Sequence, residues 1–199
     1  MKIITVIGAR PQFIKSAAIS RELFIADQSI KEIILHTGQH YDKKMSGKIF
    51  DELELEKPKY NLSIGGGTHG ENTGRMIENI EKVLINEKPN CILVYGDTDS
   101  TLAGAIAASK LKIPIFHIEA GLRSFNRKQP EEINRCLTDY LSDICFAPTE
   151  TAVKNLLNEG ISQERIFRTG DVMFDCTRIF VHKAELKSSI INHLNIKNE

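Results

Sequence analysis

The stretch CILVYGDTDSTLAGAIAASK, residues 91–110, contains a complete strand, turn and helix unit. Its first five residues form a continuous apolar run, which is typical of a strand that is covered on both faces of a parallel sheet. A single glycine and Asp97 follow, and residues 99–110 are small and apolar, as in a helix that packs closely on a sheet. Because ligands bind beyond the carboxyl ends of the strands in such sheets, Asp97 is a candidate functional residue.

The same alternation of strand and helix extends in both directions from this unit. Apolar, β-branched runs and segments of helical period follow one another along the chain, which predicts a parallel sheet with right-handed crossovers. We therefore expect an α/β protein with a Rossmann-like, doubly wound parallel sheet. The predicted strands cover residues 3–7, 32–35, 91–95, 113–118, 144–147 and 165–168, and the predicted helices include residues 11–24, 68–87 and 99–110.

The composition favours a small partner. The 199 residues, 41% of them hydrophobic, can bury a core, and 26 Lys and Arg balance 26 Asp and Glu, so no overall charge attracts nucleic acid or an anionic membrane. The N-terminal apolar run is too short for a signal sequence or a membrane span, so we expect a cytoplasmic protein. The four cysteines lack C-x-x-C spacing and are interpreted as structural thiols in a reducing compartment, with all but Cys176 in the core.

The motif GARPQFIK, residues 8–15, follows the first predicted strand. Gly8 allows a tight turn and Pro11 suits a first helical turn. Arg10 and Lys15 then lie near the positive end of the helix dipole, where an anion such as phosphate would bind. The motif is neither a dinucleotide fingerprint nor a P-loop, and two solvated cations at a helix start are the simpler interpretation of this stretch alone.

The motif HTGQHYD, residues 36–42, follows the second predicted strand. Its two histidines are four residues apart, but the glycine between them favours a turn and no third ligand is near, so we expect no metal site. The functional interpretation is that His40 or Gln39 contacts a substrate hydroxyl, and the alternative is that they only satisfy loop backbone groups. The glycine-rich stretch IGGGTHGENTGR, residues 64–75, includes a capping-box pattern and fits either a phosphate loop or a flexible connection.

Two acids follow the strand at residues 91–95, and either could cap the next helix. Asp97 is a candidate acid, base or hydroxyl anchor at a strand end, although it could also cap the next helix. Asp99 is interpreted as a helix cap. The hydroxyl groups of Thr98 and Ser100 are further possible caps.

The stretch HIEAGLRSFNRKQPEEINR, residues 117–135, places Glu119 at the tip of another predicted strand. If the strands are neighbours, this tip lies next to Asp97, and Glu131 from the following helix reaches the same edge. Three carboxylates in one poorly solvated cleft raise one another's pKa values. Such a set can hold and transfer protons near neutral pH.

A proline and two acids open the helix that ends this stretch. Pro130 suits a first helical turn, where the carboxylates of Glu131 and Glu132 are favoured by the dipole. Glu131 and Arg135 are four residues apart and can form an ion pair on one helix face. This structural pairing is the alternative to a functional role for Glu131, and Arg123 could likewise only balance the acids.

Six motifs together resemble one family, the non-hydrolysing UDP-N-acetylglucosamine 2-epimerases. They are GARPQFIK, HTGQH, YGDTDSTLAGAIAA, HIEAGLRSFN, PEEINR and APTE, and the similarity covers residues 1–180. The resemblance implies a glycosyltransferase-B-like fold, in which two Rossmann-like domains hold the substrate between them. It also implies interconversion of UDP-N-acetylglucosamine and UDP-N-acetylmannosamine for surface polysaccharide synthesis, with no metal or nicotinamide cofactor.

The resemblance also implies roles for individual residues. UDP is eliminated with the C2 proton to leave a 2-acetamidoglucal, and it then adds back while a proton reaches the opposite face. Three carboxylates match the family's catalytic acids: Asp97, Glu119 and Glu131. Two cations match residues that hold the nucleotide sugar: Arg10 and Lys15. Two further positions match residues with nearby binding or supporting roles: His40 and Arg135.

The sequence departs from the family pattern in two respects. The first motif more often reads GTRPE, and Ala9 and Gln12 here remove a negative charge, as in relatives that act on modified sugars such as 2,3-diacetamido uronic acids. Family members are also about twice as long, with a second domain that supplies a histidine and much of the nucleotide binding. We therefore expect a Rossmann-like N-terminal domain at residues 1–170, and a hinge and helical linker toward a second domain at 171–199.

This partial match leads to further expectations. The chain alone should bind a UDP-sugar weakly and turn over little, and the full-length protein should be a homodimer that binds neither nucleic acid nor membrane. Three alternatives remain open at this point. They are the acceptor domain of a glycosyltransferase with the same architecture, a non-catalytic nucleotide-sugar sensor and a hydrolysing epimerase.

Overall fold

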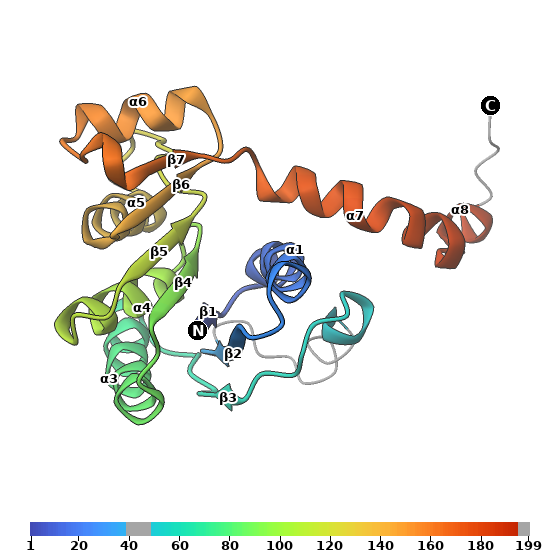
Figure 1. Ribbon diagram of the computed structural model, residues 1–199, viewed down its shortest axis with the longest axis horizontal. Coiled ribbons are helices and arrows are strands. Elements are labelled where there is room, and N and C mark those ends of the chain that lie inside the picture. Colours follow the sequence, from blue (N-terminus) through green and yellow to red (C-terminus); the bar gives the residue numbers. More distant parts are fainter. Residues whose placement is uncertain (39–48, 195–199) are drawn as a thin grey trace.

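The computed structural model describes residues 1–38 and 49–194, in which the strands form one parallel sheet. The strand order is β3-β2-β1-β4-β5-β6-β7, and every neighbouring pair is parallel (Figure 1). The expected Rossmann-like, doubly wound sheet is thereby confirmed. The strands are β1 (Lys2–Ile7), β2 (Lys31–His36), β3 (Tyr60–Asn61), β4 (Cys91–Tyr95), β5 (Ile115–Ile118), β6 (Ile144–Ala147) and β7 (Ile166–Arg168).

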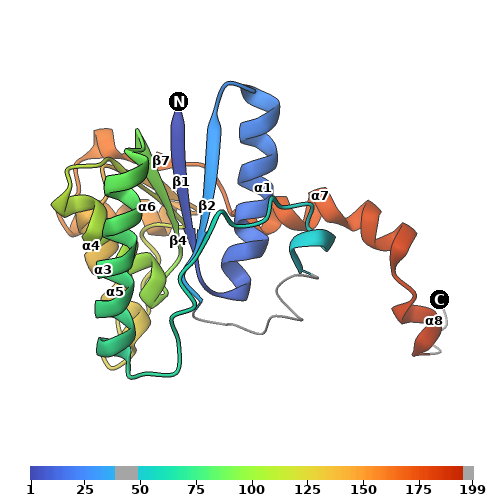
Figure 2. The same cartoon turned by 90° about the horizontal axis from the view of Figure 1, so that it is seen from below.

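Helices cover both faces of this sheet. Figure 2 shows α1 on one face and α3, α4 and α5 on the other. The chain runs from β1 outward to β2 and β3 and then returns to β4, so the direction of winding changes between β1 and β4, where such folds bind ligands. The helices are α1 (Arg10–Ala26), α3 (His69–Glu87), α4 (Asp99–Lys110), α5 (Pro130–Leu141), α6 (Glu150–Asn158), α7 (Val172–Lys187) and α8 (Ile190–His193), with a short 3₁₀ helix at Gln163–Arg165.

Small residues allow α4 to lie close to the sheet, as its sequence predicts. Its buried alanines pack on the same apolar cluster as Val6 and Val94 from the central strands. A Cβ atom added at Gly104 would lie 3.2 Å from a methyl carbon of Val94, so a larger residue there would push the helix outward. This close packing fixes the start of α4 beside the end of β4.

The capping box expected at the start of α3 is also confirmed. The Glu71 N–H donates to Thr68 Oγ1 at 3.3 Å, and the Thr68 N–H donates to the Glu71 carboxylate at 2.9 Å. In contrast, the sequence did not predict β3, because two residues, Tyr and Asn, give no periodic signal.

After β7 the chain leaves the sheet, and α7 packs its first turns against α1. Val172 and Cys176 join the apolar cluster beneath α1, and Cys176 Sγ donates to the Ile14 carbonyl oxygen at 3.0 Å. The expectation that Cys176 alone lies outside the core was wrong, since it is buried whereas Cys136 is partly exposed. None of the described helices is both long and apolar enough to cross a lipid bilayer. The domain division at residue 170 stays a prediction.

His36, at the end of β2, is a buried histidine in an apolar environment. Its ring lies 5.1 Å from that of Phe13 and 6.5 Å from that of Phe50, and the residue is only 1% exposed. Within the described part of the chain, neither ring nitrogen makes a hydrogen bond of good geometry, although the Asn61 side chain is close enough to favour the charged ring. Burial disfavours the charged ring and lowers the pKa of His36 from 6.5 to about 4.

We expect His36→Phe to reduce the loss of stability at acid pH. In wild type the unfolded chain takes up a proton at His36 more readily than the folded chain, so stability falls as the pH drops from 6.5 toward 4. Between pH 7 and pH 5 this linkage lowers the free energy of unfolding by about 2 kcal/mol. Urea denaturation at both pH values measures it, with the exposed His182→Asn as control. The same pH dependence in wild type and His36→Phe would contradict the expectation.

Candidate functional site

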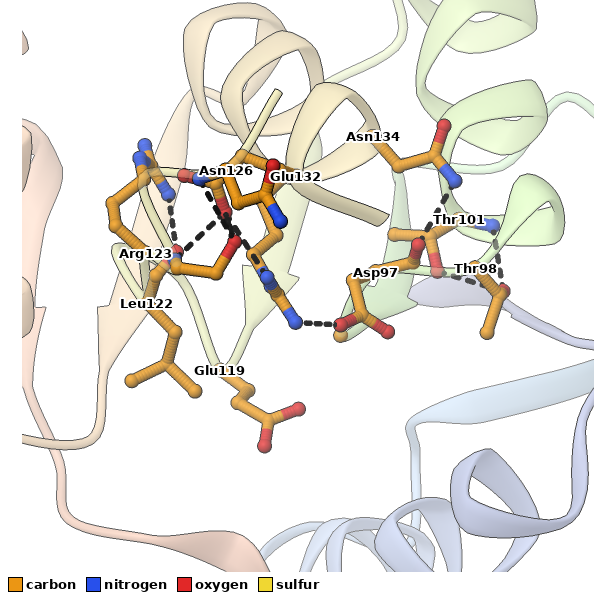
Figure 3. Close-up of polar contacts among 12 residues, drawn as sticks. Asp97, Thr98, Thr101, Glu119, Leu122, Arg123, Asn126, Glu132 and Asn134 are labelled. Atoms are coloured by element: carbon orange, nitrogen blue, oxygen red, sulfur yellow. Dashed lines mark hydrogen bonds and ion pairs between the residues drawn. The ribbon is translucent and has the colours of Figure 1, made fainter. Parts of the chain in front are cut away.

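Two of the predicted acids lie side by side at the carboxyl edge of the sheet. Asp97 follows β4 and Glu119 follows β5, and these strands pair directly, with Tyr95 opposite Ile118. Figure 3 shows both carboxylates extending from neighbouring strand ends. Gly96, which has a φ of +64°, lies against Glu119: a Cβ atom there would be 3.0 Å from the carboxylate oxygen. The β4 turn therefore needs glycine for both its conformation and this close approach.

Glu119 forms an ion pair with Lys15 from the second turn of α1. The two side chains are only 19% and 10% exposed, so water screens the pair less than it would a surface pair. The structure thus brings together a predicted catalytic acid and a predicted substrate-binding cation. The same Lys15 Nζ would be 3.3 Å from a Cβ atom at Gly96, which places the pair directly beside the β4 turn.

The backbone at Glu119 adopts a conformation that is unusual for this residue type. Its φ is +73°, in the left-handed region that non-glycine residues seldom occupy. The N–H groups of Glu119 and Ala120 both donate to the Phe146 carbonyl oxygen, at 3.1 and 3.0 Å. Strained residues of this kind concentrate at functional sites, where surrounding contacts hold them in place.

Arg135 forms an ion pair with Asp97, the other acid of the site. Helix spacing had suggested a different partner. Arg135 donates to the Asp97 carboxylate and, at 3.0 Å, to Glu132, whereas helix spacing offered an ion pair with Glu131 as the structural alternative. Arg135 takes other partners because i,i+4 spacing takes no account of an acid on a strand end. Arg135 is instead the bridge between α5 and the β4 turn.

Glu132, which the sequence analysis treated only as a dipole-favoured acid, is buried and organises the loop before α5. Its carboxylate accepts from the Ser124 N–H at 2.9 Å, the Phe125 N–H at 2.8 Å and Arg135. Burial alone would raise the pKa of Glu132, but hydrogen bonds from Ser124, Phe125 and Arg135 outweigh it and lower the pKa to about 2. Glu132 is therefore ionised at neutral pH.

The remaining predicted residues are less enclosed. Arg10 is the first residue of α1 and is exposed, and Glu131 is exposed on the first turn of α5. The predicted substrate-binding residue His40 lies outside the described residues. The structure therefore groups Asp97, Glu119 and their cations closely, with Arg10 and Glu131 on the exposed parts of two helix starts.

An Asp99–His69 pair beside Asp97 was not predicted from sequence. Thr98, not Asp99, caps α4, since its hydroxyl accepts from the Thr101 N–H at 3.3 Å, so the interpretation of Asp99 as the cap was wrong. Asp99 contacts His69 Nδ1 at 2.7 Å and accepts from Asn134 Nδ2 at 3.1 Å. The hydrogen bond to the Asp99 carboxylate is the main cause that raises the pKa of the exposed His69. The only signal in the sequence was the run of polar residues that follows β4.

Comparison with known proteins shows the family of the chain. The family model described as UDP-N-acetylglucosamine 2-epimerase matches residues 24–199. The chain belongs to this family. A UDP-N-acetylglucosamine 2-epimerase homolog from Methanococcus maripaludis is 56% identical over 100% of this chain and 55% of its own length. The UDP-2,3-diacetamido-2,3-dideoxy-D-glucuronate 2-epimerase of Pseudomonas aeruginosa is 58% identical over 92% of this chain and 52% of its own.

The structural similarity to this epimerase family is equally close. The crystal structure of Methanocaldococcus jannaschii UDP-GlcNAc 2-epimerase, in complex with UDP-GlcNAc and UDP, matches with a TM-score of 0.93 and 50% identity. The match covers 98% of this chain and 53% of that one. The chain therefore spans about half the length of the epimerases it matches.

In this member of the epimerase family, Gln12 is a buried support and not an exposed group at the helix start. Its side-chain oxygen accepts from the N–H groups of Gly8 and Ala9 at 2.7 and 2.9 Å, and its amide nitrogen donates to the Tyr95 carbonyl oxygen at 2.8 Å. Gln12 thus ties the turn after β1 to the end of β4. A glutamate carboxylate at this position could not donate to the Tyr95 carbonyl oxygen, so this contact needs the amide.

Proposed function

We propose that this chain is the N-terminal half of a non-hydrolysing UDP-N-acetylglucosamine 2-epimerase. The observation that carries the proposal is the pair of neighbouring strand ends, where Asp97 and Glu119 each contact a cation beside the point at which the sheet winding changes. Proton transfer at C2 needs carboxylates, and loss of UDP needs cations close to them. The family membership supports the same reaction.

The proposed chemistry assigns a task to each charge. A carboxylate removes the C2 proton while the bond between C1 and the UDP oxygen breaks, which leaves a C1=C2 double bond and a UDP anion. In the reverse step UDP adds to C1, and an acid delivers a proton to the opposite face of C2. We assign proton transfer to Asp97, Glu119 and Glu131, and contact with the departing diphosphate to Arg10 and Lys15.

The ion pair between Lys15 and Glu119 links these two tasks. A diphosphate close to Lys15 competes with Glu119 for its ammonium group. When the ammonium turns toward the diphosphate, the Glu119 carboxylate loses its partner and becomes available for a proton. Binding of the nucleotide sugar therefore prepares the acid that acts on it.

The experiment is exchange of the C2 proton in D₂O, using the full-length protein with UDP-N-acetylglucosamine. We expect deuterium at C2 and formation of UDP-N-acetylmannosamine, whereas residues 1–199 alone should bind weakly and turn over little. A glycosyltransferase or a nucleotide-sugar sensor would show no exchange, and a hydrolysing epimerase would release UDP to solution. Absence of exchange with every UDP-acetamido sugar offered would exclude the proposal.

A modified sugar is the second candidate substrate. The 58% identity to an enzyme named for UDP-2,3-diacetamido-2,3-dideoxy-D-glucuronate favours it, and the exposed His69, which contacts Asp99 beside Asp97, offers a ring nitrogen to a sugar carboxylate. Exchange rates with this uronate and with UDP-N-acetylglucosamine, measured side by side, decide between the two substrates.

We also propose that the full-length protein is a homodimer and that it is cytoplasmic. Light scattering of the purified protein tests the dimer.

A further inference from the structure

We propose that Asp139 is a positioning residue for both Glu119 and Asp97, and that it acts through His117 and Gly121. The inference rests on the proposed function, because it gives these two acids a role in proton transfer. Asp139 lies on α5, its side chain is 1% exposed, and it does not take part in the chemistry described above.

One carboxylate holds both sides of the strained Glu119. Asp139 Oδ1 lies 2.6 Å from His117 Nδ1, and Asp139 Oδ2 accepts from the Gly121 N–H at 3.0 Å. His117 is two residues before Glu119 and Gly121 is two residues after it. The segment that carries the left-handed backbone at Glu119 is thus fixed at both ends by a single side chain. Release of either end would let this backbone relax toward its ordinary conformation.

The other nitrogen of His117 extends the same support to the neighbouring strand end. His117 Nε2 lies 2.8 Å from the Gly96 carbonyl oxygen, one residue before Asp97. A carbonyl oxygen and a carboxylate can only accept, so both ring nitrogens must donate, and only the imidazolium form does so. His117 therefore carries a positive charge and joins the turns of β4 and β5 to Asp139.

The charges around the buried Asp139 are balanced. Arg123, whose side chain is 1% exposed, contacts Asp139 Oδ2 at 2.8 Å and Glu159 at 2.6 Å. Two cations, His117 and Arg123, thus face two anions, Asp139 and Glu159. Arg123 balances acids, as one sequence interpretation had it, but these acids are not the proposed catalytic ones. This balance makes a buried imidazolium tolerable away from water.

A purely structural role and a positioning role predict different results. If Asp139 only stabilises the fold, Asp139→Asn lowers the free energy of unfolding but leaves kcat per folded molecule unchanged. If it positions the acids, kcat for C2 exchange falls about 10- to 100-fold while KM changes little, because a small misplacement of a reacting group is costly. The matched control is the exposed Asp51→Asn, which makes the same chemical change on a residue outside this charge group.

Two substitutions of His117 separate the two arms and remain informative if Asp139→Asn does not fold. In His117→Asn the introduced amide would occupy the place of Nδ1 and keep the bond to Asp139, whereas in His117→Gln it would reach Gly96 in the place of Nε2. We expect both variants to lower kcat in the full-length enzyme, because each leaves one strand end unsupported. Full kcat in both variants would overturn the proposal.

Nitrogen NMR of residues 1–199 tests the hydrogen bonds between Asp139, His117 and the two strand ends without any enzymatic assay. With labelled histidine, we expect His117 to show two protonated ring nitrogens at neutral pH, and Asp139→Asn to remove this signature and shift the backbone amides of Glu119 and Asp97. If those amides do not move, the positioning role is wrong. If they move while the wild-type full-length protein exchanges no C2 proton, the proposed function is wrong, but Asp139 still positions the two strand ends.

Discussion

Replacing Glu119 with Gln is expected to lower kcat for C2 proton exchange by about 10²- to 10⁴-fold in the full-length enzyme. The amide keeps the shape of the side chain but cannot accept or return a proton. KM for the UDP-sugar should change much less, because the cations proposed to contact the diphosphate remain. Initial rates of deuterium incorporation, measured over a range of substrate concentrations, give both parameters.

Because Glu119 forms an ion pair with Lys15, this variant needs a control for stability. Glu119→Gln leaves a mostly buried ammonium group without its partner, so the protein also loses stability. A double variant, Lys15→Met with Glu119→Gln, removes the unpaired charge and should regain the free energy of unfolding while staying inactive. The surface substitution Glu150→Gln should leave both kcat and the free energy of unfolding unchanged. More than a tenth of wild-type kcat in Glu119→Gln would rule out this carboxylate as an essential acid or base.

Replacing Glu132 with Gln is expected to give the largest loss of stability, about 3 kcal/mol at pH 7. The amide nitrogen cannot accept from the Ser124 and Phe125 N–H groups, and Arg135 loses one of its two acids. Phe125 has a left-handed backbone, with a φ of +57°, so the loop that Glu132 holds is itself strained. Chemical denaturation of the variant and wild type measures the difference.

The pH dependence provides an independent check on Glu132. Its folded pKa of about 2 lies below the ordinary value of 4.5, so its contribution to stability is complete above pH 4.5 and disappears as the pH falls through 2. The difference between wild type and Glu132→Gln should therefore shrink as denaturation is repeated from pH 7 down to pH 3. Its exposed neighbour offers the matched control, since Glu131→Gln should be nearly neutral for stability. A difference that stays constant over this range would show that the charge of Glu132 is not what stabilises the loop.

The sheet could be predicted from sequence because its strands are continuous apolar runs separated by helices of clear period. The meeting of Asp97 and Glu119 followed from the same pattern, since neighbouring parallel strands end at one edge. Short elements and helix caps were less predictable. Asp99 resembles a cap by position alone, but the side chain of Thr98 reaches the helix N–H group and leaves Asp99 to contact His69.

The charge network behind the acids could not be predicted, because its members are far apart in sequence. Asp139 stands within a helix, where it resembles any polar residue, and its contacts with His117 and Gly121 depend on how α5 lies against β5. The partner of Arg135 was missed for a similar reason. Spacing within a helix ranks only the neighbours on that helix, and the packed fold is needed to show that Arg135 contacts Asp97.

The place of β1 in the sheet affects how the protein can fold as it leaves the ribosome. β1 is the first strand made, but it lies between β2 and β4, and its pairing with β4 joins Ile3 to Cys91. A nascent chain can thus pair β1 with β2 early, while the other edge of β1 stays open until β4 has emerged. Such long-range pairing slows folding and exposes an apolar strand edge to other chains. We therefore expect yields of folded protein to improve when a chaperone covers this edge during synthesis.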